Sequence, residues 1–107
     1  MSGYYSFSVR DGSLKKEIAS TQFNFTHKGV LDRNVNNADS IVTVDISDFT
    51  TVTVVMVLSS LPITLTVNGT AIAVTNFLFM EVSALTSLTV ACTDATGSEV
   101  EIVVWGT

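Results

Sequence analysis

The segment Asp32-Arg-Asn-Val-Asn36, followed by Asp39, places oxygen-bearing side chains at alternate positions, as a calcium-binding loop does. The match is partial, because no glycine follows the third ligand position and Thr43 stands where such a loop carries a glutamate. Arg33 also puts a positive charge inside the segment. Asn and Asp side chains often bond their own backbone in turns. We therefore interpret the segment as an Asn/Asp-rich turn, and we expect no metal ion and no cofactor.

Other residues that could do chemistry are isolated from one another. Asp45 and Asp48 lack neighbours that would make one carboxyl an acid and the other a base. His27, the only histidine, is remote in sequence from Cys92, the only cysteine. Cys92 ends the strand-like run Leu88-Thr-Val-Ala-Cys92, so we expect it to be a buried small hydrophobe. Without a phosphate-binding glycine loop or a nucleophile elbow, the sequence predicts no enzyme.

Charge divides the chain in two. All five Lys and Arg residues lie at or before Arg33, and with three carboxylates they give residues 1–33 a net charge of +2. Residues 34–107 contain seven carboxylates and no cation, for a net charge of −7. Charged residues make up 14% of the chain, against about 25% in an average soluble domain. Both observations predict a surface that is buried against other subunits.

The basic residues alternate with aromatic ones, a mixture that can bind single-stranded nucleic acid or an acidic protein surface. The acidic total charge argues against nucleic acid as the partner, and no apolar run approaches the ~20 residues of a membrane-spanning helix. Trp105 lies near the end of the sequence on a mixed face, and its pattern leaves open a core lid or an interface anchor. The candidate partner-binding residues are Tyr4, Arg10, Lys15, Lys16, Lys28, Arg33 and Trp105.

Period-two alternation of Val, Thr and Ile predicts strands throughout the chain. The strongest signal is the hairpin Ile63–Val67 and Thr70–Val74, joined by Asn68-Gly69, which is the preferred type I′ turn. That turn would pair Val67 with Thr70, Leu65 with Ile72 and Ile63 with Val74. Turn chemistry and the apolar pattern predict the same register.

Asp11-Gly12 predicts a second two-residue turn, near the N-terminus. It would pair Val9 with Leu14, Phe7 with Lys16 and Tyr5 with Ile18. Further strands are predicted at Phe23–Thr26, Ile41–Ile46, Val52–Leu58, Phe77–Val82, Leu88–Cys92 and Val100–Trp105.

These elements predict an all-β chain: a compact antiparallel β-sandwich or jelly roll of eight to ten short strands. The length fits a single domain of residues 1–107. Within it we expect a basic N-terminal hairpin and loop or arm over residues 1–39, and an acidic sandwich body over residues 40–107. We expect His27–Asp39 to be an irregular loop between them.

Three segments resemble small virion proteins of tailed bacteriophages in their order of strands and turns. They are Leu61–Gly69, Phe77–Met80 and Leu85–Ser98 with the following Val100–Gly106, and the resemblance extends over roughly residues 40–107. It implies a compact sandwich that binds other virion proteins in symmetric copies, as capsid decoration (cement) proteins and small head or tail accessory proteins do. It transfers no functional residue to this chain.

The resemblance and the composition lead to one expectation and one alternative. We expect a non-enzymatic capsid decoration protein, assembled in the host cytoplasm and carried on the virion. It would bind the major capsid or tail subunits as a homo-oligomer, with a trimer favoured. The alternative is a receptor-binding or carbohydrate-binding module of a phage tail or fibre.

Overall fold

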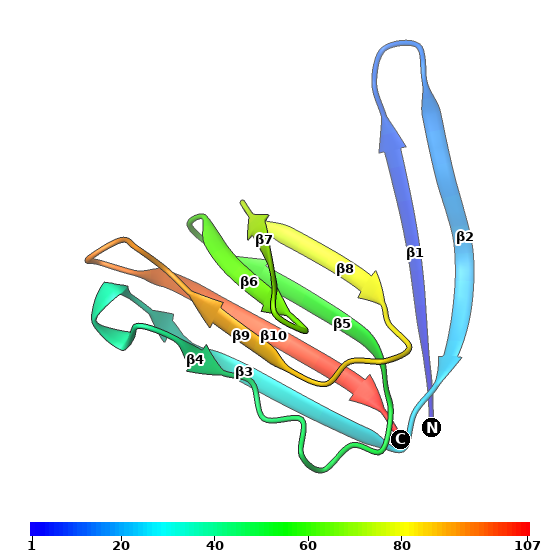
Figure 1. Cartoon of the computed structure of the whole chain (residues 1–107). Helices are drawn as coiled ribbons and strands as arrows, with labels where there is room; N and C mark the ends of the chain where they lie inside the picture. Colours follow the sequence, from blue (N-terminus) through cyan, green and yellow to red (C-terminus); the bar gives the residue numbers. More distant parts are fainter.

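Ten strands and one 3-10 turn form the regular structure of the computed structural model, which describes residues 1–107 (Figure 1). Two four-stranded sheets face each other, and a separate two-stranded ribbon stands beside them. No helix is long and apolar enough to cross a bilayer. The elements are β1 (Ser2–Arg10), β2 (Lys15–Asn24), β3 (His27–Val35), the 3-10 turn (Asn37–Asp39), β4 (Val42–Thr43), β5 (Val52–Ser59), β6 (Ile63–Val67), β7 (Thr70–Val74), β8 (Phe77–Glu81), β9 (Leu88–Ala91) and β10 (Ser98–Gly106).

The sandwich has the topology of a jelly roll. One sheet has the strand order β3-β10-β5-β8 and the other the order β4-β9-β6-β7, and all neighbours are antiparallel. The pairs β3–β10, β4–β9, β5–β8 and β6–β7 are therefore nested, as in one long hairpin folded over into two facing sheets. This arrangement confirms the predicted all-β sandwich and its jelly-roll form.

The core lies between the two sheets and consists of aliphatic side chains. Alternation places every second residue of each strand on this inner face, and on β10 these are the three residues expected, Val100, Ile102 and Val104. Cys92 is buried in the same cluster, which confirms its predicted role. The other members are Val35, Val44, Val52, Val55, Val57, Ile63, Leu65, Val74, Leu88 and Val90.

The β6–β7 hairpin has the predicted register, with Ile63 opposite Val74 and Leu65 opposite Ile72. Asn68 and Gly69 have φ values of 50° and 84°, as a type I′ turn requires. The Asn68 side chain also bonds the loop that precedes β9. Its Oδ1 accepts from the N–H of Thr86 at 2.7 Å, and its Nδ2 donates to the carbonyl of Ala84 at 2.9 Å.

The prediction of an irregular His27–Asp39 segment is wrong for most of its length. Residues His27–Val35 form β3, which pairs with β10 from Gly106 to Ser98. The partner strand lies at the other end of the sequence, so no local sequence pattern could predict the pairing. The sandwich accordingly begins at His27 and not after Asp39, and the arm is shorter than expected.

Two other strand predictions also change. Phe23 and Asn24 end β2 instead of forming a strand of their own, and the expected Ile41–Ile46 strand is reduced to Val42–Thr43. In both places the chain changes direction to move between sheets.

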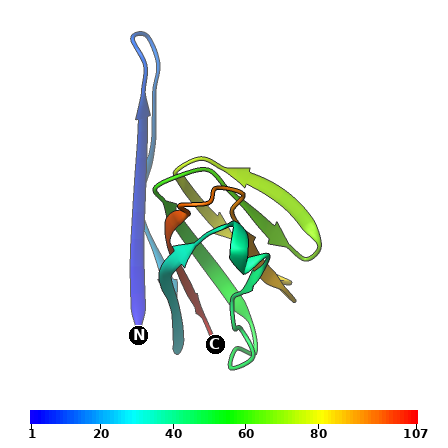
Figure 2. The ribbon, with the colours of Figure 1, turned by 90° about the vertical axis from the view of Figure 1, so that its left-hand side faces the viewer.

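The ribbon of β1 and β2 extends past the sandwich, and both views show its loop away from the body (Figures 1 and 2). The Cα radius of gyration is 14.7 Å, whereas a compact chain of this length has roughly 13 Å. The register differs from the predicted one, because Arg10 opposes Lys15 and Phe7 opposes Ile18. Asp11 explains the difference, since its Oδ1 accepts from the N–H groups of Ser13 and Leu14 and closes a longer loop.

Candidate interaction surface

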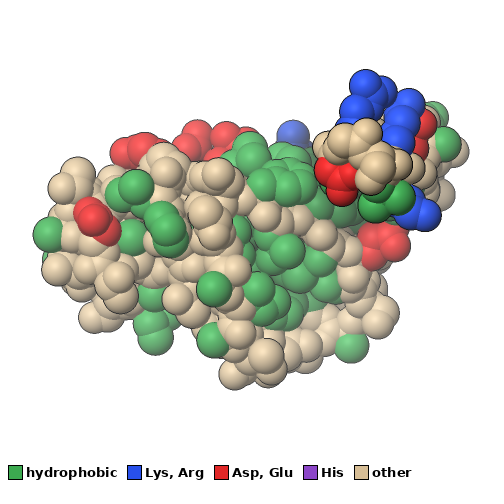
Figure 3. All heavy atoms as spheres, turned by 90° about the horizontal axis from the view of Figure 1, so that it is seen from above, with side chains coloured by type: hydrophobic (Ala, Val, Ile, Leu, Met, Phe, Trp, Pro, Cys, Tyr) green, Lys and Arg blue, Asp and Glu red, His purple; other side chains and the backbone are tan.

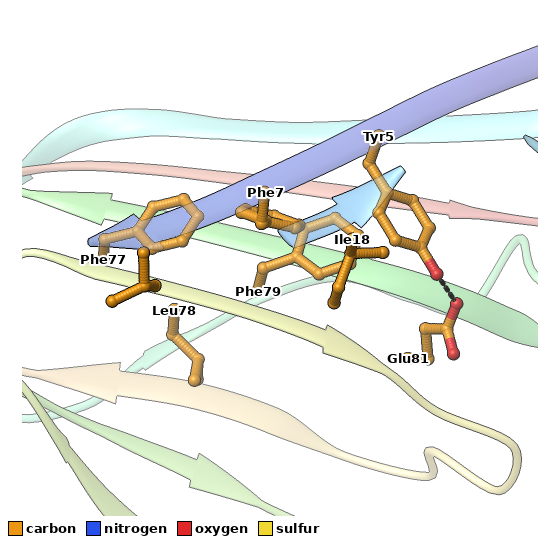
Figure 4. A pocket seen from close by; sticks show the side chains of 8 residues that line it. Tyr5, Phe7, Ile18, Phe77, Leu78, Phe79 and Glu81 are labelled. Carbon is orange, nitrogen blue, oxygen red and sulfur yellow. Dashed lines mark hydrogen bonds between the residues drawn. The ribbon is translucent and has the colours of Figure 1, made fainter. Parts of the chain in front are cut away.

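The ribbon is held on the sandwich by aromatic side chains. Tyr5 and Phe7 on β1 contact Phe79 on β8, with ring centroids 4.7 and 4.9 Å apart, and Phe7 also lies 5.8 Å from Phe77. Figure 4 shows these rings pointing toward one another from the two elements. No backbone hydrogen bond joins β1 to the sandwich. The ribbon therefore rests on side-chain contacts alone over most of its length.

One polar bond supplements these rings. The Tyr5 hydroxyl donates to Glu81 Oε1 at the end of β8 (Figure 4). This bond raises the pKa of Tyr5 above its usual value, and desolvation and the negative charge of Glu81 raise it further. The neutral phenol is the form that this contact stabilises.

Trp105 belongs to this contact, and it lies between the sandwich and the ribbon instead of over the core between the sheets. Its ring meets Phe23 of β2 edge to face at 5.6 Å. It lies on the outer face of its sheet in the same row as Val54, which is buried although it is not part of the core between the sheets. Tyr4, by contrast, is exposed.

A groove of about 510 Å³ runs between the ribbon and β8. Its lining is apolar apart from Glu81 and the Tyr5 hydroxyl. Toward the ribbon's outer end the apolar side chains are only partly covered, since Val9, Leu14 and Ile18 are 69%, 50% and 52% exposed. Figure 3 shows apolar side chains gathered on the body beside the ribbon. Burial of such a surface is what stabilises protein association.

The structure brings three of the five candidate cations together at the end of the ribbon, where Figure 3 shows Lys and Arg side chains gathered. Arg10 and Lys15 lie directly opposite each other on β1 and β2, and Lys16 follows. Residues 10–17, here called the ribbon tip, also contain Asp11 and Glu17. The Asp11 carboxylate accepts hydrogen bonds from backbone N–H groups of the loop, and Glu17 lies 3.7 Å from Lys15.

The other two cations lie elsewhere. Lys28 stands near the start of β3, opposite Trp105. Arg33 donates from Nη2 to Asp39 Oδ1 at 2.9 Å, so its side chain binds the turn that follows β3. The seven candidate residues thus form no single patch: three cations lie at the ribbon tip, Tyr4 is exposed on β1, Trp105 lies under the ribbon, and Lys28 and Arg33 lie on β3.

The Asn/Asp-rich segment is a turn only at its end: Asp32–Val35 belong to β3, and the predicted turn is confined to Asn36–Asp39. Asp39 accepts from the N–H of Asn36, and Asn36 accepts from the N–H of Ala38, which together cap the 3-10 turn. Asp45 has a similar local role. Hydrogen bonds from the Ser47 hydroxyl and then from its N–H lower the pKa of Asp45.

Sequence reasoning missed a row of acidic side chains on the outer face of the first sheet. Asp32 on β3 lies directly opposite Glu101 on β10, and Leu58 and Phe77 continue the same row on β5 and β8. Glu99 flanks the row. A hollow of about 460 Å³ is lined by all five of these residues, with Asn76 and neighbouring residues. Only the pairing of β3 with β10 brings Asp32 and Glu101 together, so the signal is absent from local sequence.

Comparisons with known proteins assign the chain to no group: no protein-family model matches it, and no curated protein does.

Proposed function

We propose that this protein is a non-enzymatic structural component of a virion, a capsid decoration protein that binds other virion subunits in symmetric copies. The observation that carries the proposal is the ribbon. A jelly-roll body with its own closed core bears a two-stranded extension that leaves Val9, Leu14 and Ile18 at its outer end half or more exposed. Isolated two-stranded ribbons are marginally stable in water, so a neighbouring molecule would complete this one.

The surface area supports the same conclusion. The chain exposes 6510 Å², against roughly 5,800 Å² for a compact monomer of its mass. The excess of about 700 Å² is close to the ~800 Å² that each partner contributes to a standard interface. In the proposed complex, burial of Val9, Leu14 and Ile18 would supply most of the affinity, and the cations would steer the encounter.

Quantitative mass spectrometry of virions tests the proposal. Particles would be purified from cells that carry the gene, and the copy number of the chain would be compared with that of the major capsid protein. We expect a fixed ratio of small whole numbers that survives repeated density-gradient purification. Absence from the particles would contradict the proposal, and a few copies that fractionate with tails would favour the receptor-binding alternative.

A further inference from the structure

The ribbon tip and the acidic row are complementary surfaces that do not meet within one chain. The tip presents Arg10 and Lys16 without a carboxylate partner, and the row presents Asp32, Glu99 and Glu101 without a cation. Figures 1 and 2 place the tip beyond the end of the body. A complementary partner for each surface is therefore available on a second copy.

Each surface contains a like-charge pair directly across two strands. Arg10 opposes Lys15 in the ribbon, where Glu17 lies 3.7 Å from Lys15, and Asp32 opposes Glu101 in the sandwich, where no cation forms a salt bridge with either. Like charges in this position destabilise a sheet. A contact between the two surfaces would relieve both repulsions at once, whereas a partner that covers only one of them would not.

The two surfaces also match in their apolar parts. Beside the acidic row, Leu58 and Phe77 are 40% and 47% exposed. Leu14, in the loop of the ribbon tip, is half exposed between the cations. The hollow of about 460 Å³ thus has apolar side chains at one end and carboxylates at the other, as the tip has Leu14 beside Lys15.

We propose that the ribbon tip of one copy docks in the hollow at the acidic row of the next copy, head to tail. Leu14 packs against Leu58 and the side of Phe77 that its own Phe7 leaves exposed, and Arg10 and Lys15 lie against Asp32 and Glu101. The contact joins two different surfaces, so repetition builds a closed ring if the rotation closes. The inference rests on the proposed function, since it names a second copy as the partner that completes the ribbon.

Sedimentation velocity of the purified full-length protein tests the inference with charge-reversal variants. The tip variant is Arg10→Glu/Lys15→Glu and the row variant is Asp32→Lys/Glu101→Lys, so that each exchanges one like-charge pair for another. We expect the wild type to form a discrete oligomer. We expect either variant alone to associate more weakly than the wild type, by about a hundredfold or more. The control Asp45→Lys/Asp48→Lys changes the net charge as much as the row variant, in a loop outside the hollow, and should associate like the wild type.

Recombination of the two variants makes the test specific. A chain that carries all four substitutions should regain the wild-type oligomer, because its reversed tip meets a reversed row. An equimolar mixture of the tip and row variants should also associate, but only in alternating order. Such a mixture can close rings of even number, and it leaves a trimer unclosed, so its sedimentation identifies the ring size.

Several outcomes would overturn the inference: a wild type that stays monomeric at high concentration, variants that associate like the wild type, or a four-fold variant that is not rescued. Circular dichroism of each variant shows whether it is folded. If a variant is unfolded, the salt dependence of wild-type association is measured in its place. We expect association to be lost between low salt and about 0.5 M salt, and association that does not depend on salt counts against the inference. If the purified protein does not self-associate but is present in virions, the inference fails and the proposed function stands. If it self-associates through these surfaces but is absent from virions, only the proposed function fails.

Discussion

Tyr5 holds the ribbon on the sandwich with two parts of its side chain. Its ring lies against Phe79, and its hydroxyl donates to Glu81. The two contacts differ in their response to pH, because only the hydroxyl titrates. The only tryptophan of the chain, Trp105, lies under the same ribbon against Phe23 and can report whether the ribbon is docked.

Docking of the ribbon should weaken at alkaline pH. The pKa of Tyr5 is raised in the folded protein, chiefly by the bond to Glu81. A group of this kind contributes stability that is complete below its unfolded pKa, 10.0 for tyrosine, and is lost as the pH rises through the folded value. We expect the Trp105 emission to shift to the red above that pH. Tyr5→Phe should abolish this pH step, and Tyr4→Phe should retain it, because Tyr4 is exposed.

Asn68 should matter through both its backbone and its side chain. Asn68→Ala removes the bonds to Ala84 and Thr86 and places alanine at a φ of 50°. We expect a loss of about 1–3 kcal/mol in the free energy of unfolding, measured in urea. Asn68→Gly restores the backbone freedom but not the bonds, so it should recover only part of the loss. A free energy for Asn68→Ala equal to that of the wild type would contradict this account.

At the scale of elements, the ribbon and the sandwich differ in how they are stabilised. Strands β5 and β10 lie in the middle of their sheet and pair on both sides. The ribbon pairs only with itself and contacts the body through a few rings. Local opening free energies follow such differences, so ribbon amides should exchange with solvent well before those of β5 and β10.

Phe79→Ala should loosen the ribbon and spare the sandwich. The substitution removes two aromatic pairs, with Tyr5 and Phe7, and each is worth roughly 0.5–1.5 kcal/mol. Hydrogen exchange should then accelerate about tenfold or more in β1 and β2, with little change in β5 and β10. Phe49→Ala is the reciprocal control, because Phe49 packs against the core and its loss should affect the sandwich strands. Equal acceleration of ribbon and sandwich amides by Phe79→Ala would show that they open together.

The same contrast explains which elements the sequence could predict. The β6–β7 hairpin was predicted to the residue because Asn68-Gly69 and the alternation act locally. In the ribbon the turn residues were located correctly, but the Asp11 side chain closed a longer loop and moved the register by two over Phe7–Arg10, before a bulge places Tyr5 opposite Thr21. Such a shift leaves each side chain on its face, so the apolar side of β1 was still correct.

Strand pairings between distant parts of the chain could not be predicted from the sequence. Strand β3 pairs with β10, and the connection between them includes six other strands. The acidic row exists only through that pairing, so it was missed together with β3. The ribbon tip, by contrast, could be predicted in part, because Arg10, Lys15 and Lys16 flank one turn.

At the scale of the whole molecule, the division of charge at Arg33 has a narrower meaning than the sequence suggested. Lys28 and Arg33 belong to the sandwich, since both lie on β3, and Arg33 is paired with Asp39. What remains is one basic ribbon tip beside a body rich in carboxylates. Charges separated by more than a Debye length of about 8 Å are screened at physiological salt, so the tip acts on surfaces that it touches.

Association through the tip should make thermal stability depend on protein concentration. A partner that binds only the folded state stabilises it by mass action, so the Tm of the wild type should rise as the protein is concentrated from about 1 to 100 µM, by a few degrees for each kcal/mol gained. Arg10→Gln/Lys15→Gln/Lys16→Gln should unfold at one temperature across this range, close to that of the dilute wild type, because the ribbon contacts with Phe79 and Glu81 are intact. Lys28→Gln should retain the dependence, since Lys28 lies outside the tip. Scanning calorimetry at matched ionic strength measures all three proteins. A wild-type Tm that does not change with concentration would mean that the second copy does not bind, and the open half of the ribbon would then require a different partner.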